Sequence, residues 1–356
     1  MRLKEQSSEL CDRLNDELVS FSPGSRFYSV RQLMLRYRVS RRVIDAALAQ
    51  LEQKGAIETR PQSGIYVKQN RLRKHVALLM PDWPSEGNKQ IQQCLKEEFQ
   101  KRADRYVFST ILYEYQENLV RKITQIPADV HIVVRPGDPL ERRELAEYAA
   151  LPSEVIFLWS DLADVSMHSL HADSEYGGML AAAYFIRNGH QNLAVLPSEP
   201  RNGDVINRIA GYTGVARLFG ARVTEIPCVV HPWDYSIRCA HDAICDYLAQ
   251  HGCNFTALFM MSDESTQGAL AAFAENGIRI PEDVSIIGYG NDHNAEFFTP
   301  HLTTISGRQQ ECAAQLAAAI DHLLENPGEI INISVRPSLI ERDSVINRKK
   351  TAKQEG

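Results

Sequence analysis

The sequence predicts a small α+β domain of winged helix-turn-helix type at the N-terminus, followed by an α/β body of two doubly wound parallel-sheet subdomains. Three observations predict this division. The chain has 356 residues, which is more than one ordinary domain needs. Residues 1–75 contain 15 Lys/Arg and 8 Asp/Glu, whereas the remaining residues contain 24 and 37. Near Val76 the pattern changes from amphipathic helices to short apolar strands that alternate with helices.

Amphipathic spacing predicts three helices in the N-terminal domain. The first ends before the turn-forming residues 22–25. Ser29 can cap the second helix and Ser40 the third, because a serine hydroxyl accepts a hydrogen bond from the first turn of a helix. Gly55 ends the third helix, as expected for a glycine just past a helix C-terminus.

Two short strands, at 56–59 and 64–67, predict a β-hairpin, or wing, after the third helix. A helix of about fifteen residues fits the major groove of DNA and contacts base edges with its N-terminal end. Polar and basic side chains at that end, together with the tip of the wing, are therefore predicted to contact DNA. These residues are Ser40, Arg41, Arg42, Gln62, Ser63 and Gly64.

This domain resembles the winged-helix domain of the GntR family of bacterial regulators. The matching residues are Pro23-Gly24, Arg31, Val39-Ser40-Arg41, Ala47-Leu48, Leu51, Gly55 and Gly64-Ile65-Tyr66-Val67. The resemblance implies that Arg31 contacts DNA in addition to Ser40, Arg41 and Gly64. The chain departs from the family pattern at Phe27-Tyr28, where the family has Leu-Pro. It departs again at Asp45, where the family has an arginine and where an acid either repels phosphate or accepts from a cytosine amine.

From Val76 onward, alternating strands and helices predict parallel sheets covered by helices on both faces. Such sheets bind ligands in the crevice at the carboxyl ends of their strands. The expected limits are 1–68 for the N-terminal domain, 69–75 for a linker, 76–345 for the body and 346–356 for a polar tail. The expected first subdomain comprises about 76–171 and 293–327, and the second about 172–292 and 328–345.

The body resembles the effector-binding domain of LacI-type regulators, which is similar to periplasmic sugar-binding proteins. The resemblance spans about residues 76 to 345. It is carried by Gly189-His190 before an apolar strand, by Arg208-Ile209-Ala210-Gly211-Tyr212, by Pro281-Glu282-Asp283-Val284-Ser285-Ile286-Ile287-Gly288-Tyr289 and by Pro300-His301-Leu302-Thr303-Thr304-Ile305. It implies a small-molecule effector, in the first place a sugar, bound between the two subdomains.

A sugar pocket needs carboxylates, amides, arginine and aromatic faces, because sugar hydroxyls both donate and accept hydrogen bonds. The resemblance implies Arg208, Asp161 and Asp263 as polar anchors, although Asp263 can instead cap a helix and Arg208 can form a structural ion pair. Gly290 stands where the family usually has an aspartate that binds sugar hydroxyls. Either Asn291 or Asp292 can replace it, or the effector lacks the usual hydroxyl. The full predicted set is Asp82, Trp83, Arg135, Asp161, Arg208, Trp233, Tyr235, Asp263, Asn291 and Asp292.

Other classes of protein are not predicted. The chain has no P-loop, no Gly-x-Ser-x-Gly motif and no HExxH motif, so we expect no enzyme. Seven cysteines without a CxxC pair argue against zinc fingers and disulfides, and we expect neither cofactor nor metal. No apolar run is long enough for a membrane span, and the N-terminus lacks a signal-peptide pattern, which favours a cytoplasmic protein.

The sequence therefore predicts a bacterial transcriptional regulator, by default a repressor, whose affinity for DNA a small molecule controls. We expect a homodimer that reads an inverted repeat in double-stranded DNA. The alternative is a sugar-binding or sugar-modifying protein in which the N-terminal domain is an accessory module.

Overall fold

The chain folds into two units, which we call the head and the body. The computed structural model describes residues 2–18, 20–61, 63–68, 73–83, 85–114, 117–135 and 140–351. One unit comprises Met1–Lys74 with Arg102–Val107, and the other comprises His75–Lys101 with Phe108–Gly356. The head is the part of the first unit up to Lys68, and the body is the second unit.

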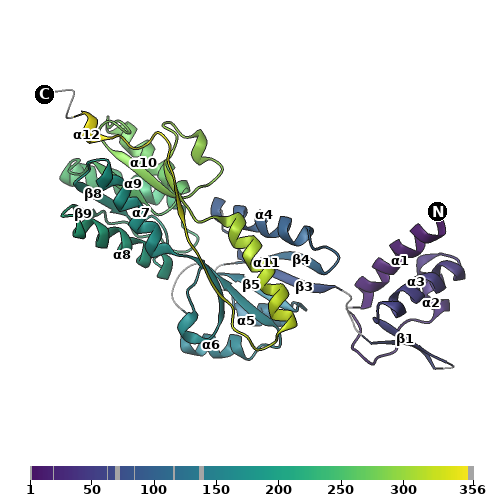
Figure 1. Ribbon diagram of the computed structural model, residues 1–356. Coiled ribbons are helices and arrows are strands. Elements are labelled where there is room, and N and C mark those ends of the chain that lie inside the picture. The colour runs from purple at the N-terminus through teal and green to yellow at the C-terminus, as the bar shows by residue number, and fades with distance from the viewer. Residues whose placement is uncertain are drawn as a thin grey trace. The chain divides into compact units, whose positions relative to one another are not determined.

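The head contains three helices and a two-stranded antiparallel hairpin, as the sequence predicts (Figure 1). Its elements are α1 (Arg2–Leu18), α2 (Val30–Tyr37), α3 (Arg41–Gln53), β1 (Ile57–Arg60) and β2 (Gly64–Val67). The helices share a core because each has apolar residues on one face; Leu14, Leu33 and Ile44 are completely buried there.

The two serines predicted as helix caps differ. Ser29 caps α2 with a full capping box, in which its hydroxyl accepts from the Gln32 amide and the Gln32 side chain accepts from the Ser29 amide. Ser40 occupies the cap position of α3, but its side chain makes no capping hydrogen bond. The exposed Ser40 hydroxyl and the first amides of α3 therefore face solvent.

The body contains two six-stranded sheets, each covered by helices (Figure 1). The first sheet has the order β13-β7-β6-β5-β3-β4 and forms the core of lobe 1. Its strands are β3 (Lys74–Pro81), β4 (Tyr106–Tyr113), β5 (Val130–Val134), β6 (Glu154–Leu158), β7 (His168–Ala172) and β13 (Asn332–Val335). The helices of this lobe are α4 (Glu86–Gln100), α5 (Leu119–Thr124), α6 (Arg142–Ala149) and α11 (Gln309–Glu325), with a short 3-10 turn, η1 (Ala163–Val165).

The second sheet forms the core of lobe 2 and has the order β14-β12-β11-β10-β8-β9. It is parallel except for β14, which pairs antiparallel with β12. Its strands are β8 (Asn192–Leu196), β9 (Arg222–Glu225), β10 (Ala257–Met260), β11 (Ser285–Gly290), β12 (Thr304–Ser306) and β14 (Ser338–Ile340). The helices of this lobe are α7 (Ser174–Arg187), α8 (Gly203–Leu218), α9 (Ser236–His251) and α10 (Asp263–Glu275), with a 3-10 turn, η2 (Ala295–Phe297).

The chain crosses between the two sheets three times, at 172–174, 306–309 and 335–338. The second and third crossings differ from the boundaries expected near 292 and 327. Strand β12 belongs to the sheet of lobe 2, and β13 to the sheet of lobe 1. These short strands contain two polar residues each, so they lack the continuous apolar run that marks a strand such as β8.

Two further boundaries differ from expectation. Strand β3 begins at Lys74, inside the expected linker. Part of the expected tail is attached to lobe 2: the Ile346 amide donates to Ser285 Oγ, and the Arg348 guanidinium donates to the Asp283 carbonyl. A short helix, α12 (Arg348–Thr351), follows. Polar composition alone predicts a free tail, but here polar side chains dock the segment.

Helices α7 and α8 pack closely, and this contact positions Arg208 beside the sheet of lobe 2. Gly178 permits it, because a Cβ atom there would lie 1.9 Å from the Arg208 carbonyl oxygen and 2.8 Å from the Tyr212 amide nitrogen. Only a glycine therefore fits at this helix crossing.

Candidate functional site: a basic head and an interlobe cavity

The predicted DNA contacts of the head are accessible. Arg31, Ser40, Arg41, Arg42 and Ser63 are exposed, and Gly64 is half-buried at the start of β2. Arg41 and Arg42 form the first turn of α3, where the helix dipole adds positive potential. Gln62, also predicted, lies outside the described residues. The exposed positions suit contact with phosphates and base edges.

Two local interactions modify this surface. Asp45 lies one turn after Arg41 on α3, and its carboxylate is 3.4 Å from Arg41 Nε. Both side chains are more than half exposed, so solvent screens the ion pair and it holds Arg41 only weakly. In the wing, the Arg60 guanidinium lies over the Tyr66 ring at 4.3 Å, and Ser63 Oγ is 2.7 Å from Tyr66 Oη. The latter two contacts fix polar groups at the wing tip.

A cavity of about 200 Å³ lies between the two lobes, at the carboxyl ends of the parallel strands. A cavity needs about 10–15 Å³ by this measure to hold one water, so this one has room for a small organic molecule. Four of the residues predicted for the effector line it: Trp83, Arg135, Arg208 and Asp292. This location is the one expected for a ligand site in an α/β sheet.

Arg208 is the central cation of the cavity and is 8% exposed. Its guanidinium lies 3.4 Å from the centroid of the Tyr289 ring, and Nη1 donates to the Met261 carbonyl at 2.6 Å. Its Nε is buried without a hydrogen-bond partner. Because a buried donor without a partner is costly, this atom is suited to a ligand acceptor.

Arg135 contributes a second guanidinium to the lining of the cavity. Its Nη2 donates to Glu144 at 3.1 Å, whereas its Nη1 is buried without a partner. The charge of Arg135 is thus compensated inside lobe 1, while one donor is available to a ligand.

Four carboxyl groups also line the cavity: Glu199, Asp204, Glu264 and Asp292. Burial raises the pKa of Glu199 to about 7 and that of Asp204 to about 6, and it also raises the pKa of Glu264. Ser262 Oγ donates to Glu199 at 2.5 Å, which offsets part of that cost. The cavity therefore holds an unusual concentration of acidic groups for its two arginines.

Asp292 is the most isolated of these acids. It is 6% exposed, and its carboxylate has no hydrogen bond within the described part of the chain. Burial raises its pKa, and the charges that act on it, from Asp263, Glu264, Glu86 and Glu199, are all negative and raise it further.

Aromatic rings form the walls of the cavity. Trp159, which directly follows β6 and has a left-handed φ of 61°, lines it together with Trp83 and Tyr289. Such a φ is strained for a tryptophan and is often found at ligand sites. Flat rings of this kind can stack on the apolar face of a sugar.

Six of the predicted effector residues do not line this cavity. Trp233 stacks on Trp83, with ring centroids 6.0 Å apart, and donates through Nε1 to the Asp82 carbonyl at 2.8 Å, so Trp233 and Asp82 join the lobes beside the cavity. Tyr235 is 56% exposed at the start of α9. Asp161 lines an adjoining hollow that shares Arg135, Trp159 and Asp204 with the cavity.

Asp263 and Asn291 have internal partners. Asp263 is fully buried and accepts from Thr304 Oγ1 at 2.6 Å and from the Asp292 amide at 2.8 Å. It is the first residue of α10, and Ser262, not Asp263, is the cap. Asn291 Oδ1 accepts from Arg342 at 2.8 Å. Both side chains hold the loop after β11 in place.

Gly290, where the related sequences are expected to have aspartate, has a φ of +130°. A Cβ atom there would lie 2.9 Å from Asp292 Oδ1. The glycine thus makes room for the Asp292 carboxylate in the cavity. Of the two replacements considered for the missing acid, the structure brings Asp292, and not Asn291, to the cavity wall.

Comparisons with known proteins agree with this architecture. Residues 6–67 match the gntR family of bacterial regulatory proteins, and residues 182–345 match the periplasmic binding protein-like domain. The HTH-type transcriptional repressor PurR of Escherichia fergusonii is 32% identical over 203 residues, which are 56% of this chain and 58% of that protein. PurR of Vibrio atlanticus is 29% identical over 66% of this chain and 69% of its own length.

Solved structures resemble the body in fold. A LacI family transcriptional regulator from Enterococcus faecium with bound ribose has a TM-score of 0.66 at 21% identity, and covers 77% of this chain and 99% of its own. The lac repressor dimer bound to operator and the anti-inducer ONPF has a TM-score of 0.63 at 19% identity, and covers 77% of this chain and 94% of its own.

The chain joins a gntR-type helix-turn-helix domain to a periplasmic-binding-protein-like domain, and its body has the fold of LacI family regulators.

In the periplasmic-binding-protein-like body, the cavity also has lining residues that the sequence does not reveal as site residues. The most polar of these are Glu199, Asp204, Glu264 and Gln309. Glu199 lies in the loop after β8, and Asp204 lies at the start of α8. Both follow the carboxyl end of a predicted parallel strand, where ligands bind in such sheets, and this position is the signal that could have identified them. Gln309 comes from α11 of lobe 1, and only the fold brings it to the cavity.

No helix in the described part of the chain has the length and hydrophobicity needed to span a bilayer.

Proposed function

We propose that this protein is a DNA-binding transcriptional regulator, by default a repressor, whose affinity for DNA is controlled by a small molecule bound between the lobes of its body. The observation that supports this most is the combination of an exposed basic α3 in a GntR-type head with an interlobe cavity that contains a buried, partly unpartnered Arg208. The regulator acts in the cytoplasm, where its DNA is, and it is not an enzyme.

The head supplies the DNA contacts. Arg41 and Arg42 at the start of α3 enter the major groove, and Arg31, Ser63 and Gly64 approach the backbone or the minor groove. A homodimer presents two heads to an inverted repeat, because two-fold symmetry in the protein requires it in the operator.

The effector is a hydroxyl-bearing small molecule of sugar size. Trp159, Trp83 and Tyr289 provide faces for its apolar side, and the cavity's carboxyl groups and Arg208 pair with its hydroxyls. The PurR proteins of Escherichia fergusonii and Escherichia coli O1:K1 are matched over 58% of their length, so their names support the regulatory role without specifying this ligand.

The effector acts by changing how the lobes close. Contacts between lobes flank the cavity: the Trp83–Trp233 stack and the hydrogen bond from the Glu86 amide to Glu264 Oε2 at 3.1 Å. A ligand that contacts both lobes binds the closed form of the body more tightly than the open form. It can shift the equilibrium toward the closed form only by the difference between these two binding free energies. Closure pivots at the three crossings and changes the affinity of the dimer for DNA.

The test of this function separates its two parts. Operator fragments are selected from a random DNA library with the full-length protein, and affinity is then measured by fluorescence anisotropy over a range of salt concentrations. Arg41→Ala should lower affinity at least tenfold and should reduce the salt slope by about one. The cavity should be unaffected, so ligand-induced thermal shifts should equal those of the unmodified protein. Unchanged DNA affinity in Arg41→Ala, or a selection that enriches no sequence, would overturn the proposal.

A further inference from the structure

The acidic groups of the cavity restrict the chemical class of the ligand more than the fold does. The inference drawn from them rests on the function proposed above. Glu199, Glu264 and Asp292 line the same cavity, and the charges of the first two act on Asp292. Arg135, Trp159 and Asp204 line both this cavity and the adjoining hollow.

Within the described residues Asp292 forms no ion pair, and the charges that act on it are all negative. The guanidinium of Arg208 lies against the Tyr289 ring and the Met261 carbonyl, and its charge acts on Glu199 and Asp204. The ammonium of Lys89 pairs with Glu86 at 2.6 Å. A buried carboxylate without a counter-ion must either keep its proton or acquire a cation from outside.

We propose that the small molecule bound in this cavity carries a protonated amino group, which lies against Asp292, Glu264 and Glu199. Its hydroxyl-bearing body extends between the tryptophans toward Asp204, so the ligand is an amino sugar or an amino polyol. The ammonium supplies the positive charge that Asp292 lacks and can donate to all three carboxyl groups. The buried, unpartnered Nε of Arg208 binds a hydroxyl oxygen of the same ligand.

The test compares matched pairs of probes with the full-length protein by isothermal titration calorimetry. The pairs are D-glucosamine with D-glucose and with N-acetyl-D-glucosamine, and D-galactosamine with D-galactose. At least one amine should bind tenfold or more tightly than its neutral partners, as expected for charge-assisted hydrogen bonds. Asp292→Asn should remove most of that preference, whereas Asp343→Asn, a change of an exposed acid outside the cavity, should leave it intact.

The outcomes distinguish this inference from the proposed function. Neutral sugars that bind as tightly as the amines would overturn the amine inference and leave the regulatory function standing. If no member of the panel binds, both the sugar-sized effector and the amine are contradicted. An amine preference that persists in Asp292→Asn and in Glu264→Gln would also overturn the assignment.

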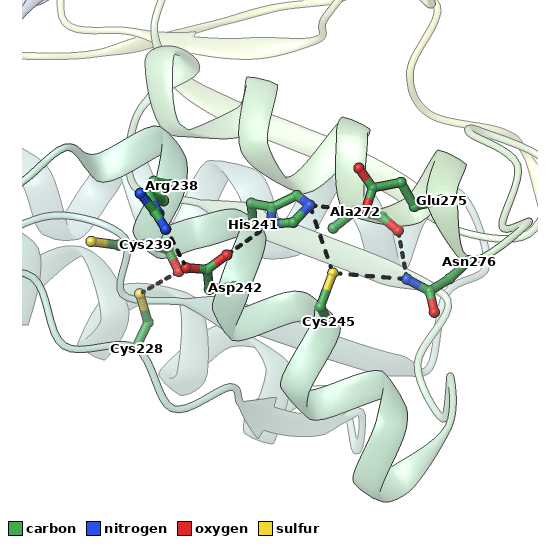
Figure 2. Close-up of polar contacts among 9 residues, drawn as sticks. All are labelled: Cys228, Arg238, Cys239, His241, Asp242, Cys245, Ala272, Glu275 and Asn276. Atoms are coloured by element: carbon green, nitrogen blue, oxygen red, sulfur yellow. Dashed lines mark hydrogen bonds and ion pairs between the residues drawn. The ribbon is translucent and has the colours of Figure 1, made fainter.

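A second, independent observation concerns the outer surface of lobe 2, where α9 and α10 pack together. His241 and Cys245 lie one turn apart on α9, and Glu275 ends α10 opposite them. Figure 2 shows the three side chains pointing toward one another. His241 Nε2 is 3.0 Å from Glu275 Oε2 and 3.8 Å from Cys245 Sγ, and all three ligand atoms lie within 4.8 Å of one another.

The surrounding side chains have the arrangement that supports metal ligands. Asp242 Oδ1 is 2.9 Å from His241 Nδ1, which leaves Nε2 directed at Cys245 and Glu275 (Figure 2). A carboxylate on the far nitrogen of a histidine commonly orients it for zinc. Asn276 Nδ2 lies 3.9 Å from Cys245 Sγ and donates to it. His241 is 29% exposed, so an ion can reach the cluster from solvent.

We infer that His241, Cys245 and Glu275 form a Zn²⁺ site with a fourth position open to water. Tetrahedral zinc places such ligand atoms roughly 3.3–3.7 Å apart, so the observed spacings need only small side-chain adjustments. A thiolate and an imidazole select zinc over magnesium or calcium. Binding displaces the thiol proton of Cys245, which goes to solvent, and the sulfur then bonds to the metal.

Cobalt provides a direct test, because thiolate ligation to Co²⁺ produces a near-ultraviolet charge-transfer band. Tag-free protein titrated with Co²⁺ should show the band, and Zn²⁺ should abolish it by competition. Cys245→Ser and His241→Ala should each remove it, whereas Cys253→Ser, at an exposed cysteine elsewhere on lobe 2, should not. No band in the folded, unmodified protein would overturn the site, and so would a band that survives in Cys245→Ser.

Discussion

Individual residues of the cavity combine burial with charge, and Glu199 shows the consequence most clearly. Burial raises its pKa to about 7, from an ordinary value near 4.5. The folded state therefore binds a proton more tightly than the unfolded state does. Stability is lost as pH rises from about 4.5 to 7, because ionising Glu199 then costs more in the folded protein.

Glu199→Gln should remove this cost. We expect the variant to be more stable than the unmodified protein by about 1–3 kcal/mol at pH 8, and by less than about 1 kcal/mol at pH 5. Urea denaturation at the two pH values measures the difference. An equal effect at both pH values would show that Glu199 does not titrate in this interval.

In the head, Asp45 reduces the positive potential at the start of α3 through its ion pair with Arg41. Asp45→Ala should free Arg41 and remove a repulsive charge near phosphate. Affinity for nonspecific DNA should rise severalfold at low salt, and the difference should shrink at high salt. Anisotropy titrations at two salt concentrations measure it. A lower affinity in Asp45→Ala would instead indicate that this carboxylate accepts from a base.

At the residue scale the sequence predicts the site only in part. It predicts Trp83, Arg135, Arg208 and Asp292, which line the cavity, because family position or a strand end marks each of them. It also predicts Asp263, whose carboxylate is turned inward to Thr304. The direction in which a side chain points depends on the residues that pack against it in the folded protein. The spacing of residues along the sequence does not reveal those neighbours.

Helix packing is the decisive property at the element scale, and α7 packs closely against α8 through Gly178. Gly178→Ala would place a methyl group against backbone atoms of α8, which cannot move without shifting Arg208. We expect a loss of about 1–3 kcal/mol in stability together with weaker ligand binding. Gly214→Ala is the matched control, because Gly214 lies in the same helix pair and a Cβ atom added there would meet no atom within 4 Å. This variant should be as stable as the unmodified protein or more stable by up to about 1 kcal/mol.

Thermal unfolding of both variants provides the measurement. A Gly178→Ala variant as stable as Gly214→Ala would show that the helices can separate without cost, and Arg208 would then not depend on this crossing.

The elements themselves are largely predictable from sequence. Continuous apolar strands such as β8 and β10 and long amphipathic helices such as α9 and α11 follow directly from their sequence pattern. The strands β12, β13 and β14 do not, because each of these short segments contains polar residues and no continuous apolar run marks it as a strand.

For the whole molecule, the division into a basic head and an acidic body follows from composition, since phosphate contacts need clustered cations. The lobe assignment does not follow as easily. The chain passes between lobes three times, so lobe 1 contains segments separated by more than a hundred residues, and β14 joins the sheet of lobe 2 only after the chain has returned through lobe 1. The cavity, its four carboxyl groups and the contribution of α11 exist only once both lobes have formed.

The central claim is that a ligand in the interlobe cavity controls DNA binding by the head. The most direct measurement is operator affinity, by fluorescence anisotropy, as a function of the concentration of the sugar or amino sugar that most stabilises the protein in a thermal-shift screen. The unmodified protein should change its operator Kd by fivefold or more at saturating ligand, whereas Arg208→Ala should bind the operator normally and show no response. An operator Kd that does not depend on a ligand shown to occupy the cavity, or a full response in Arg208→Ala, would contradict the account.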